Sequence, residues 1–98
     1  MYVVRDIFQL KFGHYRDVKP LLDEANQKKM FGENNATRIL TDFTGDAYRL
    51  VMEQTFNSLA DYENMMSGGM SQGDWQQWYT KFKEHVIGSH REILKQMA

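Results

Sequence analysis

His85 is the residue of this 98-residue sequence whose side chain is best suited to chemistry. It lies in an aromatic stretch with helical spacing, where a neutral imidazole could serve as an acid–base group or as a haem ligand. The ordinary alternative is a half-exposed histidine on the flank of a helix. We therefore treat His85 as a candidate catalytic residue and keep that alternative open.

Aromatic side chains in the same stretch could wall a pocket for a small aromatic ligand. Trp75 and Phe82 share one face of the predicted helix, and Trp78 flanks that face. All three are candidate substrate-binding residues. A stripe of this kind is more often part of a hydrophobic core, and that interpretation also stays open.

Charged residues in the middle of predicted strands form a second group of candidates. Arg5 and Glu53 could hold a polar substrate or a carboxylate, or they could form an ion pair inside a dimer interface. Arg38 and Asp42 allow the same two interpretations. Asp6 lies among apolar positions and is a candidate catalytic base if it is buried, since a buried carboxyl needs a partner or changes its protonation. The alternative is a strand bulge that turns Asp6 outward.

Metal and phosphate chemistry have no complete motif in the sequence. His90 and Glu92 alternate onto one face of a predicted final strand, but two ligands are too few for a metal site. The glycine pair at 68–69 lacks the strand–glycine–helix context of a phosphate-binding loop. We therefore expect no metal site and no bound cofactor.

Two strands joined by a tight turn form the centre of the predicted fold. Residues 38–44 and 48–57 are rich in β-branched and aromatic side chains, and Gly45 between them can adopt positive φ without steric cost. In the second strand the even positions form an apolar face, and the odd positions mix apolar with charged residues. A helix through 48–56 is the alternative, which the same β-branched and aromatic residues argue against.

A strand and a helix precede this hairpin. Residues 2–12 predict a strand with large apolar side chains on both faces, and Gly13 ends it. Apolar residues three and four apart then predict a helix over 14–30. Pro20 requires either a start near Asp17, which would cap the helix, or a bend at the proline.

Helices and a last strand follow the hairpin. Ser58 is placed to cap a helix that runs to Met66, and Asp74 to cap another over 75–86. Glycine and serine between them predict a mobile loop. Residues 90–97 have helical propensity, but the preceding elements leave a free sheet edge, so we predict a strand there.

The predicted order is β-α-β-β-α-β, which is a ferredoxin-like α+β fold with an antiparallel four-stranded sheet and helices on one face. The strands at 2–12 and 48–57 carry apolar residues on both faces, and helices on one face cannot cover both. The simplest cover is a second copy of the chain. The sequence therefore predicts a single domain over residues 1–98 that forms a two-fold homodimer.

Composition argues against several classes of function. The formal net charge is -1, so electrostatic binding of nucleic acid is not expected. There is no cysteine, which excludes disulfides and thiolate chemistry, and no long apolar run predicts a membrane-spanning helix. Met1 leads directly into the first strand and leaves no room for a signal peptide, so we expect a cytoplasmic protein.

The chain resembles the dimeric α+β barrel superfamily, and within it the NIPSNAP-like and antibiotic-biosynthesis-monooxygenase-like domains. The resemblance lies in Leu10–Gly13 before the first helix, Gly45 in the hairpin, the strand-to-helix junction Phe56–Glu63 and the closing Gly88–Leu94. Phe12 stands where the family commonly has proline. The resemblance implies a dimer whose two sheets face each other and, in many relatives, a pocket between each sheet and its helices.

The resemblance does not fix one reaction, because such proteins include cofactor-independent oxygenases, haem-degrading enzymes, isomerases and domains without known activity. Haem-degrading relatives combine a histidine and a tryptophan with a first-strand asparagine, and this chain has Arg5 and Asp6 there instead. We expect a small-molecule-binding or cofactor-independent monooxygenase-like enzyme that takes an aromatic or polar ligand. His85 or a mid-strand charge would polarise this ligand. The alternative is a non-catalytic dimerisation or interaction domain.

Overall fold

The computed structural model describes residues 1–28, 37–68 and 72–98. The elements follow in the order β1 (Tyr2–Leu10), α1 (Tyr15–Gln27), β2 (Thr37–Thr41), β3 (Arg49–Phe56), α2 (Leu59–Gly68), α3 (Gln72–Lys83) and β4 (Val86–Lys95). The strands form one antiparallel sheet in the order β2-β3-β1-β4. The predicted ferredoxin-like α+β fold is therefore confirmed, including a strand rather than a helix at the end of the chain.

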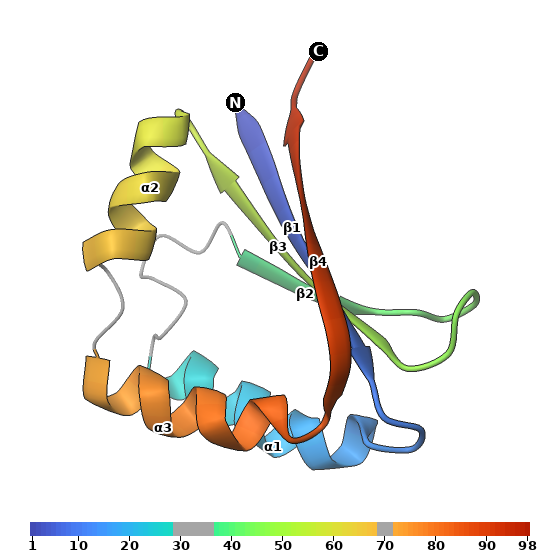
Figure 1. Cartoon of the computed structure of the whole chain (residues 1–98). Helices are drawn as coiled ribbons and strands as arrows, with labels where there is room; N and C mark the ends of the chain where they lie inside the picture. The colour runs from blue at the N-terminus through green and yellow to red at the C-terminus, as the bar shows by residue number, and fades with distance from the viewer. Residues whose placement is uncertain (29–36, 69–71) are drawn as a thin grey trace.

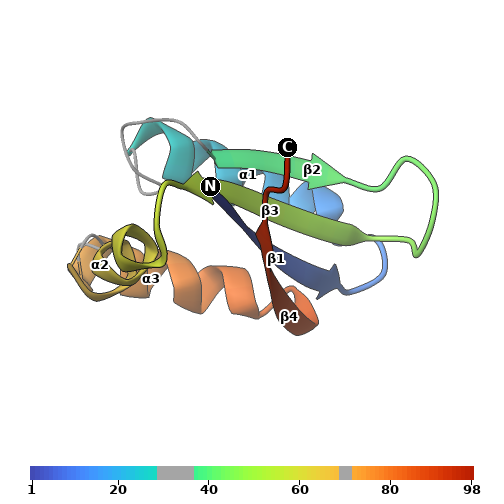
Figure 2. The same ribbon diagram turned by 90° about the horizontal axis from the view of Figure 1, so that it is seen from above.

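All three helices lie on one side of the sheet, and no described element covers the other side, which we call the open face (Figure 1). α1 and α3 pack against each other below the strands, and α2 stands at the other end of the same side. Seen from above, α1 runs beneath β2 and β3, and α3 leads to the start of β4 (Figure 2). One face of the sheet therefore packs against helices, and the other is left open by the described elements (Figure 1).

The hydrophobic core fills the space between the sheet and α1 and α3. Side chains alternate across a strand, and the even positions of β3 point to the helices, as predicted. The even positions of β1 point to the same side. The core cluster consists of Leu10, Val18, Leu22, Ala25, Leu50, Trp78 and Phe82. Burying one such large side chain stabilises the fold by about 1.5–3 kcal/mol.

α1 begins directly after His14 and contains Pro20 in its interior. Of the two alternatives left open by the sequence, a helix start capped by Asp17 is wrong, because Asp17 lies in the first turn of the helix. Proline at this position removes one main-chain hydrogen bond, and the buried apolar stripe of α1 offsets that loss. The predicted helix end at 29–30 and the loop that follows it lie outside the described residues.

β2 and β3 form the predicted hairpin, but their connection is wider than a tight turn. It spans residues 42–48 rather than 44–47. The Asp42 carboxylate accepts a 2.8 Å hydrogen bond from Arg49 N and so takes the place of a strand partner. Gly45 and Tyr48 adopt φ of 116° and 64°, which lets the wider loop reverse the chain.

α2 begins where the sequence predicts, because Ser58 caps it. Its Oγ accepts a 3.1 Å hydrogen bond from Asp61 N. Among the helices of the described residues, none is long and apolar enough to cross a membrane.

α3 is displaced toward the N-terminus relative to its prediction. It starts at Gln72, so Asp74 lies in its first turn rather than at its cap, and it ends at Lys83. β4 begins soon after, because Val86 pairs with Leu10 at the end of β1. Pairing with the neighbouring strand outweighs the helical propensity of this segment.

Replacing Phe82 with alanine should lower the free energy of unfolding by about 3–5 kcal/mol, because it leaves a cavity in the core. The Phe82 side chain is 1% exposed, and its ring lies 5.0 Å from that of Phe8 and 4.9 Å from that of Trp78. Tyr79 on the same helix is 43% exposed, and Tyr79→Ala should cost about 1 kcal/mol or less. Urea unfolding at one fixed protein concentration measures both losses. Equal losses in the two variants would contradict this position of the core.

Candidate functional site

Asp6 places a carboxylate on the helix-facing side of the sheet, where its side chain is 17% exposed. β1 pairs regularly at this position, with Asp6 opposite Met52 and Arg91, so the outward bulge considered from the sequence is wrong. Arg91 Nε donates a 2.5 Å hydrogen bond to Asp6 Oδ1. This bond raises the pKa of Arg91 above its ordinary value, so the guanidinium stays charged beside Asp6.

Tyr62 on α2 completes a polar group with these two residues, which we call the Asp6 cluster (Asp6, Tyr62 and Arg91). The guanidinium carbon of Arg91 lies 5.8 Å from the centre of the Tyr62 ring, and Phe56 contacts the same ring edge to face at 5.3 Å. The Tyr62 hydroxyl is buried and has no hydrogen-bond partner among the residues that the structure describes. A buried hydroxyl without a partner costs about 1–3 kcal/mol, so a polar ligand atom beside it would be stabilised.

A row of alternating charges crosses the open face of the sheet. Cross-strand pairing sets the order Arg38, Glu53, Arg5 and Glu92, which we call the charge row. Glu53 Oε2 accepts hydrogen bonds of 3.1 and 3.0 Å from Arg5, and Oε1 accepts one from Arg38. Arg5 also lies 3.6 Å from the carboxylate of Glu92. The candidates Arg5 and Glu53 thus form an ion pair within the chain.

Glu53 is 9% exposed although it lies on the open face. The hydrogen bond from Arg38 lowers the pKa of Glu53 below its ordinary value of 4.5; desolvation opposes this shift, and Arg5 adds to it. The carboxylate is therefore held ionised, with both oxygens engaged. Such a group is suited to structure rather than to proton transfer.

The aromatic candidates on α3 lie mostly in the core. The Trp78 ring stacks on Trp75 at 5.4 Å and on Phe82 at 4.9 Å, and its Nε1 donates a 2.6 Å hydrogen bond to Leu21 O. Trp78 and Phe82 are 3% and 1% exposed, whereas Trp75 is half-buried. Of the three, Trp75 is best placed to contact a ligand.

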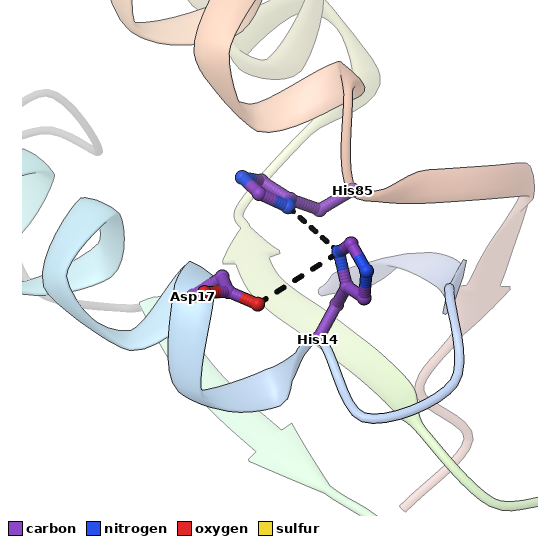
Figure 3. Close-up of side chains that lie close together, drawn as sticks. All are labelled: His14, Asp17 and His85. Atoms are coloured by element: carbon purple, nitrogen blue, oxygen red, sulfur yellow. Dashed lines mark hydrogen bonds and ion pairs between the residues drawn. The ribbon is translucent and has the colours of Figure 1, made fainter.

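His85 lies in the turn between α3 and β4, not within the helix as predicted. Its Nδ1 is 2.9 Å from Nδ1 of His14, and Asp17 Oδ2 is 3.9 Å from the same His14 atom (Figure 3). Trp75 lies eight positions before Lys83, the last residue of α3, which corresponds to about 12 Å along the helix axis, and His85 lies beyond that end. His85 and Trp75 therefore do not belong to one small site.

A further pocket lies beside the loop between β2 and β3. Its volume is about 470 Å³, and its lining includes Phe12, Tyr15, Asp42 and Arg49. Arg49 Nε is buried and has no hydrogen-bond partner within the described part of the chain. The pocket depends on the wide loop conformation, so the predicted tight turn gives no sign of it.

Sequence reasoning did not single out Tyr62, Arg91 and His14 as site residues. Alternation along β4 does put His90 and Glu92 together on the open face, as predicted. The same alternation sends Arg91 to the helix-facing side, where only the register with β1 shows that it meets Asp6. His14 meets His85 across 71 positions of sequence, a contact that local patterns cannot indicate.

Solved structures with the same fold identify what this chain is similar to. A NIPSNAP family protein from Agrobacterium tumefaciens matches with a TM-score of 0.86 at 14% identity, over 98% of this chain and 92% of that one. A NIPSNAP family protein of unknown function from the same organism matches with 0.83 at 19% identity, over 98% and 87%. A Nitrosomonas europaea protein, provisionally described as an antibiotic biosynthesis monooxygenase, matches with 0.72 at 13% identity over the whole of both chains.

No protein-family model matches the sequence, and no curated protein is detectably similar to it. The solved structures alone show that the chain has the fold of NIPSNAP and antibiotic-biosynthesis-monooxygenase-like proteins, which confirms the fold implied by the sequence resemblance.

Replacing Glu53 with glutamine should remove part of the pH dependence of stability. Because its pKa is lowered in the fold, Glu53 stabilises the protein above its ordinary pKa of 4.5, and this contribution is lost as the pH falls through the lowered pKa. Glu53→Gln should therefore cost about 1–3 kcal/mol near neutral pH and progressively less in acid. Urea unfolding between about pH 7 and pH 3 measures the difference.

Glu92→Gln is the matched control on the same face. Glu92 is 43% exposed and lies 3.6 Å from Arg5, so its loss should cost less than about 1 kcal/mol and leave the pH dependence in place. Parallel stability curves for wild type and Glu53→Gln down to acid pH would show that the arginines do not hold Glu53 ionised.

Proposed function

We propose that this protein is a homodimer that binds a small molecule at the Asp6 cluster, on the helix-facing side of its sheet. The observation that carries the proposal is the buried Tyr62 hydroxyl, which has no partner among the described residues beside a charged Asp6–Arg91 pair. Buried polar groups are normally hydrogen-bonded, and a catalytic role or a bound partner is one explanation for an exception. A ligand whose polar atom hydrogen-bonds to the Tyr62 hydroxyl would therefore bind more tightly.

The chemistry of the cluster favours an aromatic ligand with an acidic hydroxyl group, such as a phenol or an enol. Arg91 offers a positive charge to an oxyanion, and Tyr62 offers a hydroxyl as donor or acceptor. Phe56 and the Tyr62 ring supply an aromatic wall at the same place. These groups come from β3, α2 and β4, which the fold holds around Asp6.

Oxygenation without a cofactor is the reaction that we assign to this cluster. Asp6 would accept the proton of the ligand hydroxyl, and Arg91 would stabilise the electron-rich anion that then reacts with dioxygen. The fold shared with a protein provisionally described as an antibiotic biosynthesis monooxygenase supports this class of reaction. His85, whose Nδ1 faces His14, has no role in this step.

The homodimer in this proposal uses the open face of the sheet. The charge row is flanked on one side by Leu40, Val51 and Ile7, which are cross-strand neighbours, and on the other side by Val3 and Leu94. These two rows also contain His90 and Thr55 but are mainly apolar. Mainly apolar rows on both sides of a charge-neutral row suit a two-fold interface, because each row can meet its own copy. A stable interface of this kind buries about 1,600 Å² in total. The cytoplasmic location expected from the sequence remains a prediction.

A non-catalytic dimerisation domain is the second candidate function. The burial of Met52, Trp78 and Phe82 between sheet and helices favours it, because these side chains fill the space where an aromatic ligand was expected from the sequence. The two candidates share the homodimer and differ only at the Asp6 cluster.

Replacing Val51 with aspartate should convert the homodimer into a monomer. Val51 lies between Leu40 and Ile7 in the middle of the open face, so a charge there would be buried without a partner in the dimer. Light scattering should give twice the 11.6 kDa chain mass for wild type and one chain mass for Val51→Asp.

Leu59→Asp on α2 is the control for this experiment. Leu59 is 47% exposed on the helix side and should tolerate the charge with the dimer intact. The melting temperature of a dimer rises with protein concentration, which tests wild type independently of any variant. A wild-type mass of one chain, with a melting temperature that does not depend on concentration, would disprove the dimer.

Replacing Tyr62 with phenylalanine should weaken ligand binding without weakening the fold. The hydroxyl has no partner in the described chain, so its removal should leave the free energy of unfolding unchanged or higher. Loss of one hydrogen bond to the ligand should raise the Kd about fivefold. Titration with a hydroxylated flavonoid or a quinol, followed by tryptophan fluorescence, measures the Kd.

Two further variants separate binding from chemistry. Tyr79→Phe, at an exposed tyrosine, should leave the Kd unchanged, and Asp6→Asn should stop oxygen uptake while the ligand still binds. If no flavonoid or quinol changes the fluorescence and Tyr62→Phe unfolds more easily than wild type, the ligand site is refuted and the non-catalytic candidate stands.

A further inference from the structure

The turn before α1 and the turn before β4 are held together by main-chain hydrogen bonds. Lys11 N donates to His85 O at 2.9 Å, and His14 N donates to Lys11 O at 3.0 Å. Gly13, at φ 78°, supplies the chain reversal that precedes His14. The backbone therefore sets how closely His14 and His85 approach.

The imidazoles of His14 and His85 face each other through their Nδ1 atoms. Their Nδ1 atoms are 2.9 Å apart, and the ring planes are inclined by 55° (Figure 3). Two neutral imidazoles can share only one proton in such a contact, so one Nδ1 presents a lone pair to the N–H of the other. Asp17, in the first turn of α1, brings a carboxylate oxygen to the same place, and the three ligand atoms lie within 4.8 Å of one another.

We propose that His14, Asp17 and His85 bind one divalent transition-metal ion, with zinc best suited to the donor set. Two imidazole nitrogens and one carboxylate oxygen are typical ligands of Zn²⁺, Co²⁺ and Ni²⁺, whereas Mg²⁺ and Ca²⁺ prefer oxygen ligands alone. Zn–N bonds of about 2.0–2.1 Å place two nitrogens of a tetrahedral site roughly 3.3–3.4 Å apart. The Nδ1 atoms need to separate by only about 0.5 Å, which small side-chain rotations supply.

Solvent access leaves a position for a fourth ligand. The side chains of His14 and Asp17 are 35% and 50% exposed, so a water molecule can complete the tetrahedral shell. The bound ion replaces the proton that the imidazoles share, and it joins the start of α1 to the turn before β4. None of these three residues belongs to the Asp6 cluster, so the site stands or falls independently of the proposed function.

The chain offers its own control, because it has three histidines and the third is placed elsewhere. His90 lies on the open face in β4, opposite Ile7, and is not part of this group. Zinc titrated calorimetrically into metal-free protein should bind with one ion per chain. His14→Gln and His85→Gln should each raise the Kd for zinc at least about 100-fold, and Asp17→Asn by a smaller factor of about 10. His90→Gln should bind zinc as tightly as wild type.

Two independent readouts keep the test decisive if a variant folds poorly. Co²⁺ should give the visible absorption of a tetrahedral nitrogen–oxygen site in wild type and His90→Gln but not in His85→Gln, and Mg²⁺ should not compete for the site. Saturating zinc should raise the melting temperature of wild type and His90→Gln but not that of His14→Gln or His85→Gln. Zinc affinity and stoichiometry that survive both His14→Gln and His85→Gln, or that fall only in His90→Gln, would overturn the proposal, as would failure of wild type to bind zinc.

Discussion

In the part of the chain that the structure describes, helices lie on one side of the sheet only (Figure 1), and the ion pairs of the charge row neutralise the charges on its open face. Glu53 is nearly buried there, and an unpaired carboxylate in that position would cost several kcal/mol. Arg38 and Arg5 on the neighbouring strands engage both of its oxygens, which ties β2, β3 and β1 together across the centre of the sheet. Glu92 continues the alternation to β4. All four strands thus contribute to one electrostatic row, whose net charge is zero.

Strand and helix types follow from local patterns in this sequence, and they give the fold. Alternation in β3 assigned the core face correctly, and Ser58 marked the start of α2. The predicted ends of strands and helices were wrong where a hydrogen bond from a side chain or pairing with a neighbouring strand outweighed the local sequence pattern. The Asp42 carboxylate pairs with Arg49 N and widens the hairpin loop, and pairing of Val86 with Leu10 ends the helical region early. Neither effect can be inferred without knowing which segments meet.

The candidate sites were less predictable than the fold, because their chemistry arises from contacts between segments that are far apart in the sequence. Asp6 was recognisable as a polar residue at an apolar position, but its partner Arg91 lies 85 positions away. His85 was recognisable by type, yet its environment is set by His14 and not by the tryptophans of its own segment. A sequence pattern indicates which residues are unusual. Register and backbone turns determine what each of them meets.

Asp6 and Glu53, two carboxylates of the central strands β1 and β3, differ in how many of their oxygens accept hydrogen bonds from arginines. Both oxygens of Glu53 accept hydrogen bonds from arginines, so protonation would require breaking an ion pair at either oxygen. Asp6 accepts its bond from Arg91 at Oδ1, and within the described residues Oδ2 has no hydrogen bond from the protein. In the proposed reaction this second oxygen would accept the proton of the ligand hydroxyl, while Oδ1 keeps its bond to Arg91. The same sheet therefore holds one carboxylate whose two oxygens both accept hydrogen bonds from arginines and one that is oriented by a single arginine through one oxygen.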